Sequence, residues 1–382
     1  MKAIFSPETF LGIGFGLGAS TSLRFLGPVG ISEILIILGT LGLLAKKRSA
    51  LFSFPKNTYG IFKIYFMLSM LIILPLATLI TFFTQYSHLT DPIYLISFFI
   101  SCILFITVIE HLHANTLDMK TITILFTIFF LVSGVLGLIF VPDHVSQRLA
   151  GFSDNPNQPA FYACSLLILL FLYFGSGKFF PIILVVSFTL ISTSDAFTLY
   201  IFTVSFIYIF LKIILYDRFT VALRFLIVLF FLLMILAFLI IFFKDDVKLF
   251  WNLADEGGTR LMLFINGLKA AFESPIIGHG VGHFSGLYRP FQGLEAHSTP
   301  IDLATIFGIP FTLIIYGLVV VASFNFFKFK RYGLVAISIG YLVSGLFHFN
   351  GRHFVFWFSM AVLAAFAFHT QYLKEKNKCV EL

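Results

Sequence analysis

The sequence contains little charge, and this shortage excludes an ordinary soluble domain. Only 11% of its 382 residues are Asp, Glu, Lys or Arg, whereas soluble globular domains carry about 25%. Hydrophobic residues make up 59% of the chain, and Phe alone occupies 53 positions. The mean hydropathy is +1.00. This composition indicates a chain whose segments lie in a lipid bilayer.

Cysteine is also scarce, and its placement excludes a disulfide framework. Cys102 and Cys164 fall in apolar runs, and Cys379 lies near the C-terminus. The sequence shows no Cys/His spacing typical of a metal site, so we expect neither a metal nor a cofactor. The first hydrophobic stretch lacks a basic n-region and a cleavage site of small residues, so we do not expect a removable signal.

Apolar runs of about 20 residues recur along the whole chain, which is the length that a membrane-spanning helix requires. They seldom alternate apolar with polar residues, which disfavours a β-barrel. We predict an all-α integral membrane protein with about 12 transmembrane helices, forming a single polytopic domain over residues 1–382. The predicted spans are 5–22, 29–45, 60–83, 91–111, 120–141, 157–175, 179–193, 196–215, 220–243, 297–321, 332–349 and 353–371.

The distribution of Lys and Arg orients these spans, because cytoplasmic loops carry an excess of both. With the N-terminus in the cytoplasm, 17 of the 25 basic residues fall on the inner side and 8 on the outer side. Both termini are then cytoplasmic, and residues 244–296 form a large outer loop, containing short helices, between spans nine and ten. The net charge of +7 is explained by these loops, so we expect no nucleic-acid partner.

The outer basic residues are mostly arginine. Five of the eight are Arg, whose planar guanidinium binds phosphate through two hydrogen bonds, whereas Lys acts as a point charge. This bias favours an anionic ligand on the outer side, although contacts with lipid headgroups explain it equally well. The five are Arg24, Arg148, Arg260, Arg289 and Arg352.

The long outer loop contains a predicted helix from Gly257 to Ser274, with Thr259 as its N-cap. At 100° per residue, the polar residues Asn266, Lys269 and Glu273 share one face, which we expect to face water. Arg260 falls on the opposite face. It either reaches lipid headgroups from an interfacial helix or points into a cavity at the membrane surface.

The sequence Pro275 to Phe284 follows this helix and contains three alternating glycines, Gly278, Gly280 and Gly282. Glycines of this kind can expose backbone amides to an anion. A lone pattern of this type is weak, so a flexible turn is the better interpretation.

His297 stands where the chain is predicted to re-enter the membrane, with Glu295 before it and Asp302 beyond it. A histidine at such a boundary is usually a solvated cap. A neutral imidazole can nevertheless accept a proton near neutral pH. His297, or Glu295 if the loop folds back, is therefore a candidate general base.

Four stretches together carry a family resemblance through their order and spacing: NPNQPAFYA from Asn155, TRLMLFINGLKAAFESPIIGHGVGHF from Thr259, AHSTPIDLATIFGIP from Ala296, and GRHFVFWF from Gly351. In these stretches the chain resembles the O-antigen polymerase and O-antigen ligase superfamily. The resemblance implies a metal-independent, inverting glycosyltransferase of the bacterial cell inner membrane. Such an enzyme passes an oligosaccharide from undecaprenyl diphosphate to an acceptor glycan at the periplasmic face.

The resemblance also implies roles for individual residues. His297 matches the family's loop histidine, and Arg260 matches the Arg that opens the loop helix. Three further residues, Arg148, Arg289 and Arg352, stand where the family places arginines that bind the diphosphate or glycan, and Asn155 and Asn157 match its N-P-N element. The chain departs from the pattern at Asp195, which occupies a position where many members carry Arg, and at Ser298, where Asn is common.

Polymerase and ligase differ in their acceptor, which is another lipid-linked repeat unit or the core sugar of lipopolysaccharide. We expect polymerisation of surface-polysaccharide repeat units, with ligation as the alternative. The expected partners are the lipid-linked oligosaccharide, the acceptor glycan, membrane lipids and a chain-length regulator. Two other classes remain open: a transporter of lipid-linked sugar or polysaccharide, which would carry ionisable residues at mid-membrane depth, and a non-enzymatic partner in polysaccharide assembly.

Overall fold

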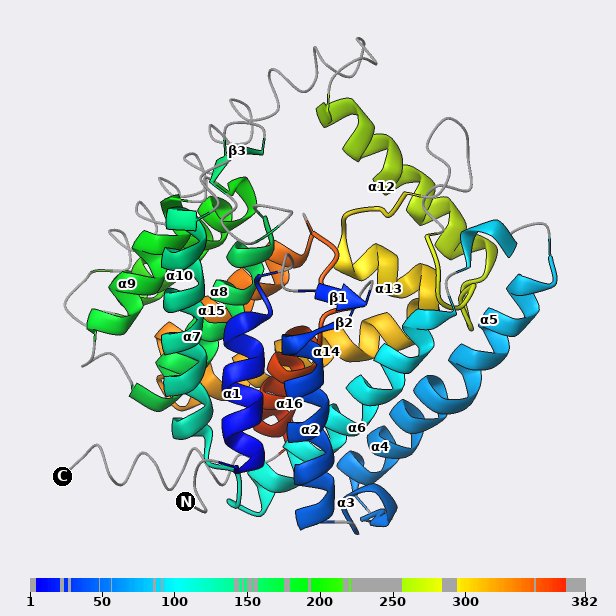
Figure 1. Ribbon diagram of the computed structural model, residues 1–382, viewed down its shortest axis with the longest axis horizontal. Coiled ribbons are helices and arrows are strands. Elements are labelled where there is room, and N and C mark those ends of the chain that lie inside the picture. The colour runs from blue at the N-terminus through cyan, green and yellow to red at the C-terminus, as the bar shows by residue number, and fades with distance from the viewer. Residues whose placement is uncertain are drawn as a thin grey trace.

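A computed structural model gives the fold of the chain (Figure 1). The structure describes residues 5–20, 24–26, 29–47, 49–55, 57–84, 87–90, 92–140, 144–145, 148–149, 153, 157–174, 179–191, 194–215, 220, 256–283, 294–346 and 348–368.

The described residues are predominantly helical. Their helices are α1 (Pro7–Leu17), α2 (Ile31–Lys46), α3 (Ser49–Phe52), α4 (Thr58–Leu68), the π-helix η2 (Ser69–Ile73), α5 (Leu74–Phe82), the 3₁₀-helix η3 (Ser87–Leu89), α6 (Ile93–His113), α7 (Met119–Phe140), α8 (Asn157–Phe174), α9 (Phe179–Ile191), α10 (Asp195–Ile214), α12 (Glu256–Glu273), α13 (Thr299–Phe307), α14 (Ile309–Lys328), α15 (Tyr332–Gly345) and α16 (Phe354–Phe368). Two short antiparallel pairs, β1 (Arg24–Leu26) with β2 (Val29–Gly30) and β3 (His144–Val145) with β4 (Arg148–Leu149), complete the elements.

Five helices in the described part of the chain are long and apolar enough to cross a membrane. They are Thr58–Phe82, Ile93–His113, Met119–Gly137, Phe197–Ile214 and Ile309–Lys328. Shorter apolar helices occupy Asn157–Tyr173, Phe180–Leu190, Tyr332–Gly345 and Phe354–Phe368. The prediction of a helical protein with several apolar helices of membrane-spanning length is thus confirmed. The count of twelve spans stays a prediction, and nearly all of the predicted span 220–243 lies outside the described residues.

Local sequence explains where several helices begin. The Ser6 side chain accepts a hydrogen bond from the Thr9 amide at 3.1 Å, and Pro7 occupies the first turn of α1. The Asn57 side chain accepts from the Gly60 amide at 3.0 Å and so caps α4. Such caps satisfy amides that the helix itself leaves unpaired.

Helix α16 forms the centre of the molecule, and every residue from Phe354 to Phe366 is buried. It packs against α6 and α14, and Figure 1 shows it enclosed by other helices. Trp357 lies at the middle of an aromatic cluster, with ring centroids 6.0 Å from Phe66 and 6.3 Å from Phe105. Since α16 is surrounded by protein, its near-continuous apolar sequence reflects a core helix.

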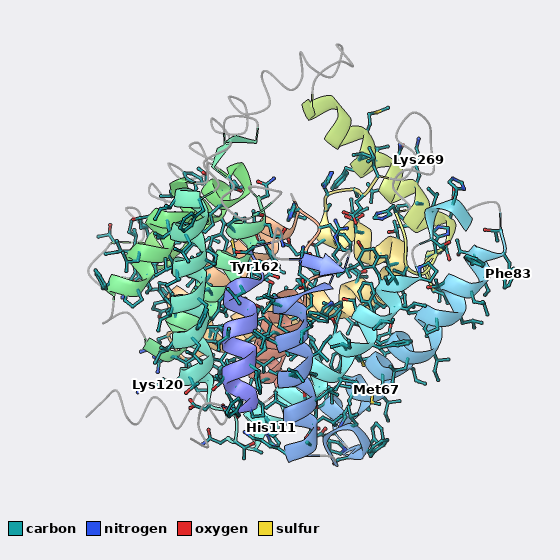
Figure 2. The ribbon with its side chains drawn as sticks, in the orientation of Figure 1. Met67, Phe83, His111, Lys120, Tyr162 and Lys269 are labelled. Atoms are coloured by element: carbon teal, nitrogen blue, oxygen red, sulfur yellow. The ribbon has the colours of Figure 1, made fainter. Side chains whose placement is uncertain are left out.

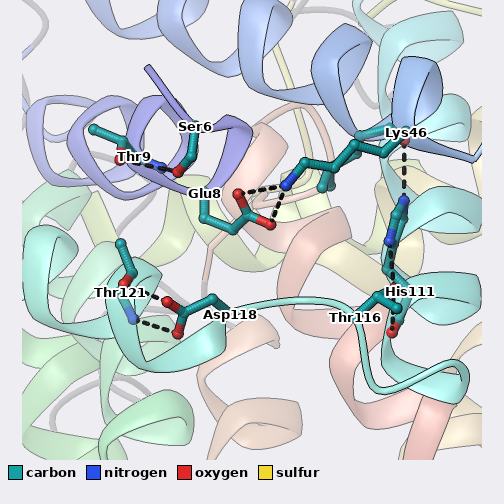
Figure 3. A network of polar contacts seen from close by, with 9 residues as sticks. Ser6, Glu8, Thr9, Lys46, His111, Thr116, Asp118 and Thr121 are labelled. Carbon is teal, nitrogen blue, oxygen red and sulfur yellow. Dashed lines mark hydrogen bonds and ion pairs between the residues drawn. The ribbon is translucent and has the colours of Figure 1, made fainter. Parts of the chain in front are cut away.

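One end of the bundle is tied by ion pairs and hydrogen bonds. Lys46 at the end of α2 lies 2.8 Å from Glu8 of α1, and His111 of α6 bonds the Leu43 carbonyl at 3.0 Å (Figure 3). The completely buried Lys63 amine lies 3.0 Å from Glu110. In Figure 2, His111 and Lys120 lie at this end, far from Lys269 of α12.

The predicted span 297–321 is wrong as one continuous helix. The structure divides this sequence into α13 and α14 at Gly308, whose φ is 88°. This left-handed conformation cannot continue an α-helix, and glycine adopts it without steric cost. The break makes α13 a nine-residue helix, and α14 alone has the length of a span.

The predicted loop helix exists as α12, with two differences. It begins at Glu256, so Thr259 lies inside the helix and is not its N-cap. Asn266 was expected to face water with Lys269 and Glu273, but it is 5% exposed, whereas the other two are exposed. The packing of α12 against α13 buries the edge of the polar stripe that carries Asn266.

Candidate functional site

Three segments of the chain surround α13. Residues 278–283 start at the end of the helix, residues 294–298 directly precede it, and residues 348–353 bond to its beginning. The third segment is bonded directly to the helix, because the Thr299 amide and hydroxyl both donate to the His348 carbonyl, at 3.1 and 2.5 Å. The Thr299 oxygen also accepts from the Asn350 amide at 3.0 Å. These bonds fix the loop that carries Arg352.

The glycine-rich segment, residues 278–283, packs closely on the end of α13 and continues to His283 beside Glu295. The amides of His279 and Gly280 donate to the carbonyls of Thr305 and Ile306, at 2.7 and 3.1 Å. A Cβ atom on Gly278 would lie 2.3 Å from the Ile306 oxygen. The anion-binding interpretation is therefore wrong for the His279 and Gly280 amides, because the end of α13 already occupies them.

Glu295 is the centre of the site. Its side chain is buried, and its Oε2 accepts a hydrogen bond from Arg352 Nη2 at 2.5 Å. Its other oxygen, Oε1, lies 3.3 Å from His283 Nδ1. Burial by itself raises the pKa of Glu295, but His283, Arg352 and His297 together outweigh it and hold this pKa below the ordinary value of 4.5. Glu295 is therefore a carboxylate at neutral pH.

His297 lies beside this carboxylate in an unusual backbone conformation. Its φ is 52°, and its side chain is half-buried. The two side-chain oxygens of Asp302 accept hydrogen bonds from the amides that flank His297, that of Ala296 at 2.9 Å and that of Ser298 at 3.0 Å. Burial and the neighbouring Glu295 raise the pKa of Asp302 to about 8. Left-handed backbone is uncommon for residues other than glycine. The two hydrogen bonds to Asp302 stabilise this conformation at His297.

Two buried polar side-chain atoms near the start of α13 have no hydrogen-bond partner in the described part of the chain. They are Ser298 Oγ and Asn350 Oδ1. Buried polar groups are nearly always paired. Unpaired atoms at this point fit a site whose polar groups find partners when a ligand binds.

The predicted site residues have four different outcomes in the structure. Glu295, His297 and Arg352 are brought together. Asn157 opens α8 and accepts a hydrogen bond from the Ser194 hydroxyl at 2.8 Å, and α8 approaches the third segment through Phe161, whose ring centroid lies 5.8 Å from that of His353. Arg260 lies in the second turn of α12 and Arg148 in β4, described by backbone alone, while Arg289 and Asn155 lie outside the described residues.

Local sequence does not single out His283, yet the structure brings it to Glu295. The role of Asp302 in bonding the turn was also missed. An acidic residue in the first turn after Ser-Thr-Pro was the available signal, since such residues bond amides at a helix start. Asp195, the departure from the family pattern, opens α10 next to its N-cap Ser194, where an acidic residue suits the helix dipole.

Within the described residues, no group of three or more His, Cys, Asp or Glu side chains could hold a metal ion. No protein-family model matches the chain, and no curated protein matches it either. Five helices of the described chain have the length and apolar composition of membrane-spanning helices, which is the feature that the chain shares with membrane proteins.

Proposed function

We propose that this protein is a membrane glycosyltransferase that uses an undecaprenyl-diphosphate-linked oligosaccharide as donor and acts at the periplasmic face of the bacterial inner membrane. The observation that carries the proposal is the convergence of His297, Glu295 and Arg352 from two segments of the chain. It combines a candidate base with a fixed guanidinium at one end of a helical membrane protein. The motif resemblance adds the donor and acceptor classes.

In the proposed reaction, the His297 imidazole accepts the proton of an acceptor hydroxyl. The hydroxyl oxygen attacks the anomeric carbon of the donor from the face opposite the diphosphate. The new C–O bond forms as the bond to the diphosphate oxygen breaks, and undecaprenyl diphosphate leaves with the electron pair. Configuration at the anomeric carbon is inverted.

The environment of Glu295 favours His297 as the base. A carboxylate with a lowered pKa is a weak proton acceptor, and both Glu295 oxygens already contact cationic or potentially cationic partners. Glu295 instead suits the orientation of Arg352 and His283. A guanidinium held in this way can stabilise the negative charge that develops on the departing diphosphate.

The test is glycan transfer by purified variants in liposomes with lipid-linked donor. His297→Ala should lower the rate by about 10²–10⁴-fold, the usual contribution of a general base, without changing thermal unfolding. Retention of more than a tenth of the activity would exclude His297 as the base. Glu295→Gln would then be assayed as the next candidate.

Polymerisation is the preferred assignment within this class, and ligation to lipid A-core is the alternative. A deletion strain distinguishes the two through its lipopolysaccharide bands. One repeat unit on the core indicates a polymerase, whereas bare core with accumulated lipid-linked polymer indicates a ligase.

A transporter of lipid-linked sugar is the second candidate, and the buried Lys63–Glu110 pair is the observation in its favour. Ionisable residues inside membrane helices commonly mark transport pathways. Here Glu110 is three residues from the end of α6, and Lys63 is in the second turn of α4. Transporter sites lie near the bilayer midplane, so the depth of this pair argues against transport. Movement of labelled donor without glycan transfer would reverse that conclusion.

A further inference from the structure

The second half of α12 presents an apolar stripe to the surroundings. Leu268 and Phe272 are four residues apart on α12, so their side chains lie on one face of the helix. Ile276 stands in the turn that follows the end of α12 at Glu273. Leu268, Phe272 and Ile276 are 38%, 69% and 74% exposed. Exposed contiguous apolar surface of this kind marks a protein or membrane contact.

The rest of α12 is arranged around this stripe. Leu263, Ala270 and Ala271 are at most 2% exposed, where the helix packs on α13. Lys269 and Glu273, one position beyond Leu268 and Phe272, form an exposed charged line beside the apolar one. A helix with an apolar line next to a charged line, and with protein behind it, has the arrangement of an interfacial helix.

The apolar stripe continues onto a helix of membrane-spanning length. The Ile309 amide at the start of α14 donates to the Pro275 carbonyl at 2.7 Å, immediately before Ile276. Along α14, Leu313 and Phe324 are 66% and 67% exposed and lie on one face, eleven residues apart. Since this exposed face of a membrane-length helix leads directly to Ile276, lipid is the occupant that covers both.

We propose that the second half of α12 docks on the bilayer, in the leaflet where α14 begins, with Phe272 and Ile276 among the acyl chains. Lys269 then lies at the level of the headgroups, where a lysine is attracted to anionic lipid. The inference is independent of the proposed function, since it rests on exposure and continuity alone.

Docking of α12 would also set the depth of the candidate site. His279, just beyond the helix, bonds back to the Ala270 carbonyl of α12 at 2.9 Å, and the same segment continues to His283 beside Glu295. The lipid contact and the site are therefore joined by a short, hydrogen-bonded piece of chain.

Site-directed spin labelling in proteoliposomes of phosphatidylethanolamine and phosphatidylglycerol tests the proposal. Cysteines are placed singly at positions 269, 272, 273 and 276 in a full-length chain whose Cys102, Cys164 and Cys379 are replaced by Ser. Collision rates of each label with oxygen, which concentrates in the acyl region, are compared with those of a water-soluble nickel chelate. Leu313→Cys on α14 gives the reference value for a lipid-facing site.

Labels at Phe272→Cys and Ile276→Cys should match the oxygen-to-nickel ratio at Leu313→Cys, while labels at Lys269→Cys and Glu273→Cys should shift toward nickel. Equal nickel collisions at positions 269, 272, 273 and 276 would overturn the proposal, because the stripe would then face water. Shielding of positions 272 and 276 from both reagents would also overturn it, since a second copy or another protein would then cover the stripe. The five label positions carry exposed side chains. Cys102 and Cys164 are buried, so thermal unfolding of the cysteine-free chain is compared with that of the wild type before labelling.

Discussion

At the scale of single residues, the turn at His297 is the most informative part of the site. A non-glycine residue in the left-handed region costs about 1–3 kcal/mol and persists only where its surroundings impose it. Asp302 imposes it here through two hydrogen bonds that bracket His297. These bonds determine the direction in which the imidazole leaves the backbone, so Asp302 is a positioning residue for the proposed base.

Asp302→Asn should therefore lower kcat about 10²-fold with little change in KM, because an amide keeps one acceptor oxygen and loses the other. Misplacement of a reacting group by about 1 Å has a cost of this order. Steady-state transfer assays at saturating donor measure the effect.

Asp118→Asn is the matched control for that measurement. Asp118 also bonds an amide at a helix start, since it accepts from the Thr121 amide at 3.1 Å before α7. Asn caps a helix about as well as Asp, so this substitution should change stability little and leave kcat unchanged. An equal fall of kcat in both variants would show that Asp302 supports the fold and nothing more specific.

Glu295 should make the stability of the protein sensitive to acid. Because its pKa in the folded state is below the ordinary 4.5, its contribution to stability is complete above about pH 4.5 and is lost as the pH falls through the folded-state value. Thermal unfolding in detergent should therefore fall more steeply below pH 4.5 in the wild type than in Glu295→Gln. Identical slopes would mean that the network around Glu295 is not formed in solution. Glu273→Gln, which removes an exposed carboxylate from α12, is the control.

At the scale of elements, the break between α13 and α14 decides the architecture of the site. Helix α13 ends at Phe307, and the Gly308 turn allows the next helix to start against Pro275. The same turn leaves the carbonyls of Thr305 and Ile306 free to accept from the glycine-rich segment. A continuous helix over 297–321 would have used these carbonyls within its own backbone ladder.

Gly308→Ala should destabilise the protein by about 2–3 kcal/mol, the cost of a side chain in such a backbone conformation. Its Cβ would also lie 2.3 Å from the Ile276 oxygen. Gly317→Ala in α14 is the comparison, because no described atom lies within 4 Å of its added Cβ. It should be neutral or stabilising by up to about 1 kcal/mol. The unfolding temperatures of Gly308→Ala and Gly317→Ala are measured and compared. Equal unfolding temperatures would contradict the role given to Gly308.

At the scale of the whole molecule, the two ends of the bundle differ in chemistry. Lys120 and His111 lie at one end, and Lys269 of α12 lies toward the other (Figure 2). His111 bonds the Leu43 carbonyl near Lys46 of α2, so the first end also carries the basic end of α2. The positive-inside rule assigns the lysine end to the cytoplasm.

We therefore expect Glu273→Cys to react with a membrane-impermeant maleimide in intact spheroplasts and Lys120→Cys to react only after lysis. Both side chains are exposed, so accessibility within the fold does not limit either reaction. The reverse pattern would invert the topology and place the site on the cytoplasmic side.

The sequence by itself determined the class of protein and most of its helices, because hydrophobicity and caps act over a few residues. It also singled out His297 and Glu295 by local chemistry, and it offered Arg352 as one of five outer arginines and through the family resemblance. Only the tertiary structure decided that Arg352 bonds Glu295 across 57 residues, that His283 joins them, and that Asn266 is buried. Contacts of this kind join particular residues of distant segments. The periodic pattern within each segment does not show which residues of another segment it will contact. Gly308 depends on sequence and on tertiary structure. Glycine permits the positive φ that separates α13 from α14, and the close packing of Ile276 and Pro275 against this turn requires it.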